Sequence, residues 1–178
     1  MTVVPELEQD LRRAVRDVPD FPRPGILFKD ITPLLGDAGL LRATVHAMTE
    51  PFRGLGVTQV VAIESRGFIL GSPVALGLES GFVPVRKPGK LPYHRRSTEY
   101  ALEYGSGALE IHADACAGDA RVLVVDDVLA TGGTAAATGR LLAELGAQVV
   151  GYSFLIELQA LGGRGRLGNV PVSAVLEY

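Results

Sequence analysis

Residues 121–134, RVLVVDDVLATGGT, contain the pattern that decides the fold class. The run opens with a short β-branched stretch, residues 122–125, which is typical of a strand buried on both faces of a parallel sheet. We expect this strand to end in the acidic pair Asp126 and Asp127, and we expect a helix over residues 134–145. Strand, polar turn and helix in this order predict an α/β protein.

The rest of the chain repeats this alternation. Further strands are expected at residues 57–63, 82–85, 148–155 and 172–176, and helices at residues 5–17, 38–52 and 68–78. Two segments, residues 20–30 and 86–105, lack both periods and are expected to be loops. The pattern predicts a mainly parallel, twisted sheet flanked by helices, in a single domain over residues 1–178. In such sheets ligands bind beyond the carboxyl ends of the strands.

The composition excludes several other classes of protein. Apolar residues make up 47% of the chain and charged residues 21%, which favours a packed core over disorder. The net charge of −3 gives no general support for nucleic-acid binding, and no apolar run reaches the roughly 18 residues of a membrane span. With one cysteine, Cys116, and no signal-peptide pattern at the N-terminus, we expect a cytoplasmic protein.

The segment after the 122–125 strand has the chemistry of a phosphate site. Thr131 and Thr134 supply hydroxyls, and the glycines between them let the backbone approach a ligand at a helix start, where unpaired amides favour anions. Asp126 and Asp127 would repel a phosphate, but carboxylates suit ribose hydroxyls or waters on Mg²⁺. A ribose 5-phosphate offers both groups. On residue types alone, an acidic turn and a capping threonine remain an open alternative.

A second glycine pattern, GRGRLG at residues 163–168, has the spacing of a dinucleotide-binding loop. It comes ten residues before the last residue of the sequence, too late for the βαβ unit that such a loop needs. We therefore expect residues 163–168 to form a surface turn.

The stretch VLVVDDVLATGGT resembles the signature of the type I phosphoribosyltransferases. The resemblance implies that Asp126 and Asp127 contact the ribose hydroxyls of phosphoribosyl diphosphate. It implies that the 5-phosphate is wrapped by Ala130, Thr131, Gly132, Gly133 and Thr134. It also implies a homodimer, and Mg²⁺ as a cofactor that the substrate carries, with no direct protein ligand and with bridging waters to the acidic pair.

Two other segments are similar to the adenine-specific branch of this family. The first is Glu64-Ser65-Arg66-Gly67-Phe68, where Arg66 can offer a two-pronged donor to phosphate oxygens; a surface ion pair with Glu64 is the alternative. The second is VPVRKPGKLP, residues 83–92, followed by LEYG at residues 102–105. It overlaps a basic run, RKPGKLPYHRR at residues 86–96, which holds five of the 17 lysines and arginines and for which a solvated charged loop is the alternative.

The resemblance of these segments implies a diphosphate site and a catalytic group. The implied diphosphate contacts are Ser65, Arg66, Arg86, Lys87, Lys90 and Tyr104. A non-proline cis peptide bond is implied near Ser65. Glu103, in the LEYG sequence of residues 102–105, corresponds to the family's general acid/base on a flexible loop. Arg95 and Arg96 have no counterpart in the resemblance, so we expect them to be solvated charges.

The segment DFPRPGILFKD, residues 20–30, carries the resemblance that concerns the base. It implies a small base-binding hood in which adenine contacts Ile26, Leu27, Phe28 and Leu158. Backbone amide and carbonyl groups near Phe28 can tell adenine from hypoxanthine or guanine, because the wrong base leaves buried groups unpaired. Lys29 stands where the family commonly has arginine, which removes a two-pronged donor.

Together these motifs imply a purine salvage enzyme. The implied reaction transfers the 5-phosphoribosyl group of 5-phospho-α-D-ribose 1-diphosphate to N9 of adenine and gives AMP and diphosphate. Two alternatives stay open: a transferase for another purine base, and a regulator that senses phosphoribosyl diphosphate without catalysis. The regulator would need a nucleic-acid surface, which the acidic net charge does not favour.

Overall fold

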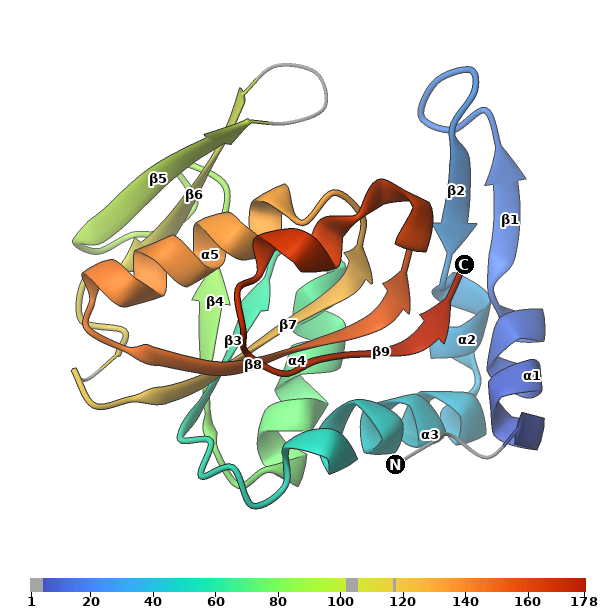
Figure 1. Cartoon of the computed structure of the whole chain (residues 1–178), viewed down its shortest axis with the longest axis horizontal. Coiled ribbons are helices and arrows are strands. Elements are labelled where there is room, and N and C mark those ends of the chain that lie inside the picture. The colour runs from blue at the N-terminus through green and yellow to red at the C-terminus, as the bar shows by residue number, and fades with distance from the viewer. Residues whose placement is uncertain (1–4, 102–105, 117) are drawn as a thin grey trace.

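The centre of the computed structural model is a five-stranded sheet, and the structure describes residues 5–101, 106–116 and 118–178 (Figure 1). In spatial order the strands are β4 (Gly81–Val85), β3 (Gln59–Ile63), β7 (Arg121–Leu129), β8 (Gln148–Glu157) and β9 (Val172–Glu177). Every neighbouring pair in this sheet is parallel. The predicted mainly parallel α/β sheet is confirmed.

Helices cover both faces of the sheet (Figure 1). On one face lies α5 (Gly133–Glu144), and on the other lie α3 (Ala38–Thr49) and α4 (Arg66–Gly77). The remaining helical elements are α1 (Pro5–Ala14), α2 (Thr32–Gly36), and the 3-10 turns η1 (Glu50–Phe52), η2 (Gln159–Leu161) and η3 (Gly163–Arg166). All the described helices are too short or too polar to cross a membrane.

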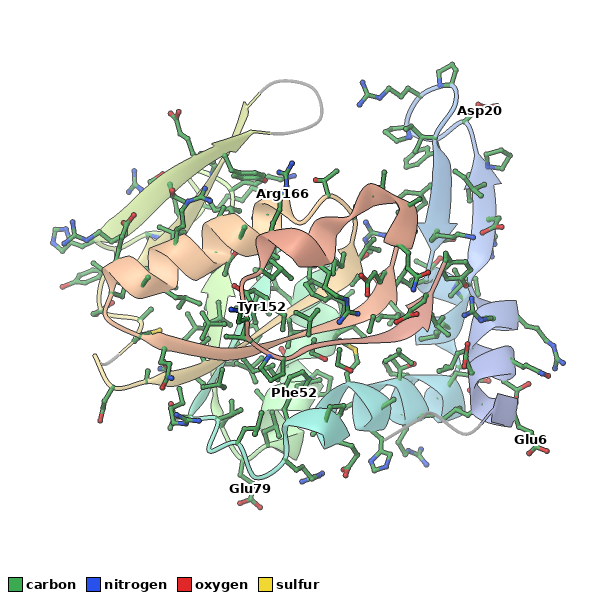
Figure 2. The ribbon with its side chains drawn as sticks, viewed as in Figure 1. Glu6, Asp20, Phe52, Glu79, Tyr152 and Arg166 are labelled. Atoms are coloured by element: carbon green, nitrogen blue, oxygen red, sulfur yellow. The ribbon has the colours of Figure 1, made fainter. Side chains whose placement is uncertain are left out.

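The sheet separates two apolar cores, and β7 contributes to both. Val122 and Val124 face the α5 core, Leu123 and Val125 face the α3 and α4 core, and all four are fully buried. Figure 2 shows the same division, with Tyr152 on the α5 side and Phe52 on the α3 side. This double burial explains the continuous apolar run in the sequence of β7.

Two antiparallel hairpins project beyond the carboxyl ends of the central strands (Figure 1). In one, β1 (Arg16–Pro19) pairs with β2 (Leu27–Asp30), and in the other β5 (Arg95–Ala101) pairs with β6 (Ser106–His112). The first hairpin corresponds to the predicted hood. The prediction that residues 20–30 and 86–105 are irregular is wrong for β2 and β5. β5 is mostly exposed, and β2 has one exposed and three half-buried residues, so neither strand has the apolar alternation of a strand with one buried face.

Several element boundaries also differ from those expected, among them those of β7 and α1. Strand β7 continues to Leu129, so Asp126 and Asp127 lie within it rather than after it. Helix α1 ends at Ala14 instead of residue 17, because Arg16 already begins β1. Within this longer strand, the acidic pair lies next to the first turn of helix α4.

We predict that Leu123→Ala destabilises the fold far more than the same change at Leu161. Leu123 is fully buried in β7, so truncation removes apolar contacts and leaves a cavity, at a cost of about 2–5 kcal/mol. Leu161, in η2, is 46% exposed, and its truncation should cost less than about 1 kcal/mol. Denaturant titration of both variants measures the difference, and equal midpoints would contradict this account of the core.

Candidate active site

The acidic pair of β7 lies against the beginning of α4. Oδ1 of Asp126 accepts a hydrogen bond from the backbone amide of Asp127 at 2.9 Å. A Cβ atom on Gly67 would come within 2.9 Å of the same oxygen. Oδ2 of the buried Asp127 lies 2.9 Å from Nη1 of Arg66. Consecutive strand side chains normally face opposite ways, yet both carboxylates reach the first turn of α4.

Arg66 connects this pair to the β1–β2 hairpin. Its guanidinium carbon lies 4.9 Å from the centre of the Phe28 ring, and the ring of Phe21 packs edge-on against Phe28 at 5.1 Å. The alternative ion pair between Arg66 and Glu64 is not formed, because Arg66 pairs with Asp127 instead. The peptide bond between Glu64 and Ser65 is cis, as the resemblance implied.

The acidic pair retains capacity for further hydrogen bonds. Oδ2 of Asp127 is buried and accepts no well-aligned hydrogen bond from the described residues, although Arg66 lies close to it. Burial raises the pKa of Asp126 well above its ordinary value, and the nearby charge of Asp127 raises it further. An unsatisfied buried acceptor costs about 1–3 kcal/mol, so a ligand hydroxyl placed here would be bound favourably.

The turn from β7 into α5 encloses a small hollow of about 70 Å³. The predicted phosphate-loop residues all line it: Ala130, Thr131, Gly132, Gly133 and Thr134. Gly132 has φ of +76°, a left-handed conformation that glycine adopts at no steric cost. Helix α5 then begins at Gly133, one residue earlier than expected, so unpaired first-turn amides belong to residues that line the hollow.

The carboxylate of Glu64 accepts hydrogen bonds from the first part of the basic segment, residues 86–90. Its side chain is only 6% exposed, and Oε1 accepts from Nζ of Lys90 at 3.0 Å. Oε2 accepts from Nε of Arg86 at 3.2 Å and from the amide of Lys87 at 3.1 Å. Burial alone would raise the pKa of Glu64, but the hydrogen bonds from Lys90, Lys87 and Arg86 hold its pKa below the ordinary value.

These contacts bring together three of the predicted diphosphate residues, Arg86, Lys87 and Lys90, whereas Arg66 pairs with Asp127. Arg86 and Lys90 converge on the carboxylate that directly precedes Ser65. Sequence reasoning did not assign Glu64 a place in the site. The signal was available, because Glu64 directly follows the buried strand β3, at the carboxyl edge where such sheets bind ligands.

Glu110, on β6, attaches the second hairpin to this cluster. Its buried carboxylate accepts from the amide of Gly89 at 3.0 Å and from Nε of Arg95 at 2.9 Å. The backbones of Arg86 and Glu110 also exchange hydrogen bonds at 2.9 and 2.7 Å. Arg95 is therefore paired with Glu110 although its side chain is 47% exposed, so the prediction of a solvated charge holds only in part; Arg96 is exposed as expected. No sequence motif marks Glu110.

In the segment expected to read the base, the backbone groups of Ile26 are already hydrogen-bonded, whereas strand β2 has one unpaired edge among the described residues. The amide of Ile26 donates to the carbonyl of Arg23, and its carbonyl accepts from the amide of Phe21, both at 3.3 Å, so Ile26 is engaged in its own turn. Leu27 is 50% exposed and Phe28 is half-buried. In the described part of the chain β2 pairs with β1 alone. Neighbouring strand residues direct their backbone groups to opposite edges, so at the unpaired edge of β2 the open amide and carbonyl belong to one of Leu27 and Phe28.

Leu158 and Lys29 have defined places beside this segment. Leu158 donates its amide to the carbonyl of Leu129 at 2.9 Å, and its side chain packs on the α3 and α4 core. Nζ of Lys29 lies 2.7 Å from Oδ1 of Asp17 and 3.9 Å from the centre of the Tyr178 ring. Lys29 thus fastens the hairpin to the C-terminal residue.

Two predicted residues, Glu103 and Tyr104, lie outside the described residues.

The structure adds to the site Gly163, a residue that the sequence interpretation had assigned to a surface turn. Gly163 is buried against the phosphate loop, so the prediction of a surface turn at residues 163–168 is wrong at its first residue. Its neighbour Leu167 is buried as well.

Comparison with known proteins agrees with this geometry. Residues 50–163 match the family model of the phosphoribosyl transferase domain. The adenine phosphoribosyltransferase of Myxococcus xanthus is 56% identical over 172 residues, which cover 97% of this chain and 94% of that protein.

Solved structures extend the agreement to three dimensions. The adenine phosphoribosyltransferase of Rhodothermus marinus has a TM-score of 0.93 and 55% identity, with 97% of this chain and 99% of that chain covered. The Saccharomyces cerevisiae enzyme, complexed with an imino-altritol bisphosphate and adenine, has a TM-score of 0.90 and 41% identity, with 97% and 99% covered. These matches confirm the predicted family and its fold: the chain belongs to the adenine phosphoribosyltransferases.

Proposed function

We propose that the site transfers a 5-phosphoribosyl group from phosphoribosyl diphosphate to N9 of adenine, giving AMP and diphosphate for purine salvage. This is the activity of the family to which the chain belongs. The observation that carries the proposal is the position of Arg66, which pairs with Asp127 and lies over Phe28. A ribose site, a diphosphate donor and a base-stacking ring therefore adjoin one another.

The substrate would lie along the carboxyl edge of the sheet. Its 5-phosphate would occupy the hollow of residues 130–134, and its ribose hydroxyls would donate to Asp126 and Asp127. The diphosphate would be held by Ser65, Arg66, Arg86, Lys87, Lys90 and Tyr104. Adenine would lie between Phe28 and Leu158, with its edge read by the backbone of Leu27 and Phe28, while Ile26 shapes the turn.

The chemistry follows from this placement. The bond between ribose C1 and diphosphate breaks with its electron pair leaving on the diphosphate, and the N9 lone pair of adenine forms the new bond from the opposite face. The carboxylates of Asp126 and Asp127 favour the positive charge that develops on the ribose. Glu103 takes up the proton that the purine ring loses, for which loop closure must raise its pKa above the usual value of about 4.3.

Mg²⁺ fits this site as a cofactor carried by the substrate. Oδ2 of Asp127 has no well-aligned donor among the described residues, and the carboxylate of Asp126 lies beside it, so the pair can accept from waters on the ion. When bound, Mg²⁺ neutralises charge on the leaving diphosphate. Asp126 and Asp127 would orient its waters, with no direct protein ligand.

We predict a strong preference for adenine among purine bases. The backbone of β2 can pair with the amino group and ring nitrogen of adenine, whereas the oxo bases reverse that donor and acceptor pattern and leave groups unpaired. A coupled assay of diphosphate release with adenine, hypoxanthine, guanine and xanthine measures this preference, with the reaction lacking a base as control. Faster turnover of an oxo base would point to the alternative transferase, and no turnover of any base to the regulator.

We predict that Glu103→Gln lowers kcat by about 10²–10⁴-fold, the usual contribution of a general acid or base. The KM for phosphoribosyl diphosphate should change little, because the substrate's phosphates are held elsewhere. Glu99→Gln, on the exposed strand β5, is the matched control and should leave kcat unchanged. Steady-state kinetics of both variants decide the matter, and an unchanged kcat for Glu103→Gln removes that residue from proton transfer.

We also propose a homodimer located in the cytoplasm. Helix α4 and strand β4 expose three large apolar side chains, with Ile69 48%, Leu76 80% and Phe82 38% exposed. Ile69 and Leu76 are seven residues apart and so lie on one face of α4, and neighbouring exposed apolar groups of this kind mark association sites. A reducing compartment is supported by the single cysteine, Cys116, which is a free buried thiol.

We predict that Leu76→Glu converts the dimer to a monomer. A charge on this face would have to be buried without a partner when two copies associate, which is strongly unfavourable. Light scattering after size-exclusion chromatography gives the mass, with Leu161→Glu as a control on another exposed leucine. A dimeric Leu76→Glu, or a monomeric unaltered chain, would contradict the proposed interface.

A further inference from the structure

The turn η3 approaches the phosphate loop backbone to backbone. A Cβ atom added to Gly163 would lie 2.2 Å from the carbonyl oxygen of Ala130 and 2.8 Å from the amide nitrogen of Gly132. A Cβ atom added to Gly132 would lie 2.4 Å from the carbonyl oxygen of Gly163. Such separations are far below van der Waals contact, so neither position accommodates a side chain without movement of the loop. The phosphate loop therefore rests directly on Gly163.

Arg164 anchors this turn to the sheet. Its Nε donates to Oε1 of Glu157 at 3.1 Å, its Nη2 donates to Oε2 of the same carboxylate, and its Nη1 donates to the carbonyl of Val172 at 2.6 Å. Glu157 is the last residue of β8 and pairs in register with Leu129, the last residue of β7. The side chain of Glu157 is only 6% exposed. A two-pronged pair with a buried carboxylate holds the arginine in one geometry.

We propose that Gly163 and Arg164 are positioning residues that act as a clamp on the 5-phosphate loop. The clamp joins the loop at Ala130 and Gly132 to the last residue of β8 and the first residue of β9. Arg164 fixes where the turn lies, and the missing side chain of Gly163 lets the loop backbone settle against it. The clamp would keep the loop amides directed at the 5-phosphate before the ligand arrives, which lowers the cost of ordering the loop on binding. The inference rests on the proposed function of that loop.

Gly163→Ala tests the clamp against Gly165→Ala as a matched control. Both glycines belong to η3, but a Cβ atom at Gly165 would meet no atom within 4 Å. We expect Gly163→Ala to raise the Kd for ribose 5-phosphate and the KM for phosphoribosyl diphosphate at least about tenfold, because the added methyl displaces the loop. The Kd for inorganic diphosphate should change less than about twofold, since that group would bind at the separate Glu64 cluster.

Calorimetry with ribose 5-phosphate and with diphosphate separates the outcomes. A folded Gly163→Ala that binds ribose 5-phosphate as tightly as the unaltered chain overturns the clamp, as does an equal loss of affinity for both ligands. If Gly163→Ala does not fold, Arg164→Lys is the test variant, because lysine keeps the positive charge but cannot form the two-pronged pair with Glu157. Arg164→Lys should weaken the binding of ribose 5-phosphate selectively. Unchanged binding of ribose 5-phosphate overturns the clamp. An unaltered chain that binds no ribose 5-phosphate contradicts the proposed function itself.

Discussion

Strand β7 is hydrogen-bonded by β3 and β8 and covered on both faces, and the arrangement of the site depends on this burial. Its apolar residues cannot shift without opening one of the two cores, so the carboxyl end of the strand has one position. The acidic pair lies within the last four residues of the strand, and the loop of residues 130–132 and the start of α5 follow directly. Loops bind ligands best when a rigid scaffold positions them, and β7 is the scaffold here.

Around this strand, buried carboxylates organise the cations of a site proposed for an anionic substrate. Asp127 holds Arg66, Glu64 holds Arg86 and Lys90, and two further buried acids, Glu110 and Glu157, hold Arg95 and Arg164. A buried acid that is paired in this way gives an arginine or lysine a defined position in the ligand-free protein. Diphosphate and ribose would then bind to groups that are already placed, and Arg66 would exchange part of its contact with Asp127 for the substrate.

The errors of sequence interpretation share one physical origin. The sequence pattern of buried apolar residues contains no information on backbone pairing or on contacts between segments that are distant in the chain. The strands β2 and β5 contain no fully buried residue among those whose burial is described and are paired through their backbones, so their sequences lack an apolar period. Arg95 looks like one more charge in a basic run, and only the fold brings Glu110 beside it. Gly163 belongs to a glycine-rich turn in the sequence, and its role depends on contact with a loop more than 30 residues earlier.

The sequence by itself determined the alternating strands and helices, the parallel sheet and the glycine-containing turn from β7 into α5, because burial on both faces of a strand and the start of a helix are local patterns of residue type. Resemblance of the motifs then indicated the family, which the comparisons confirm. Only the tertiary structure decided that Arg66 meets Asp127 and Phe28, that Glu64 binds Arg86 and Lys90, and that Gly163 packs against the loop of residues 130–132. Those contacts join segments distant in sequence, and packing in three dimensions selects the partners that a local pattern does not specify.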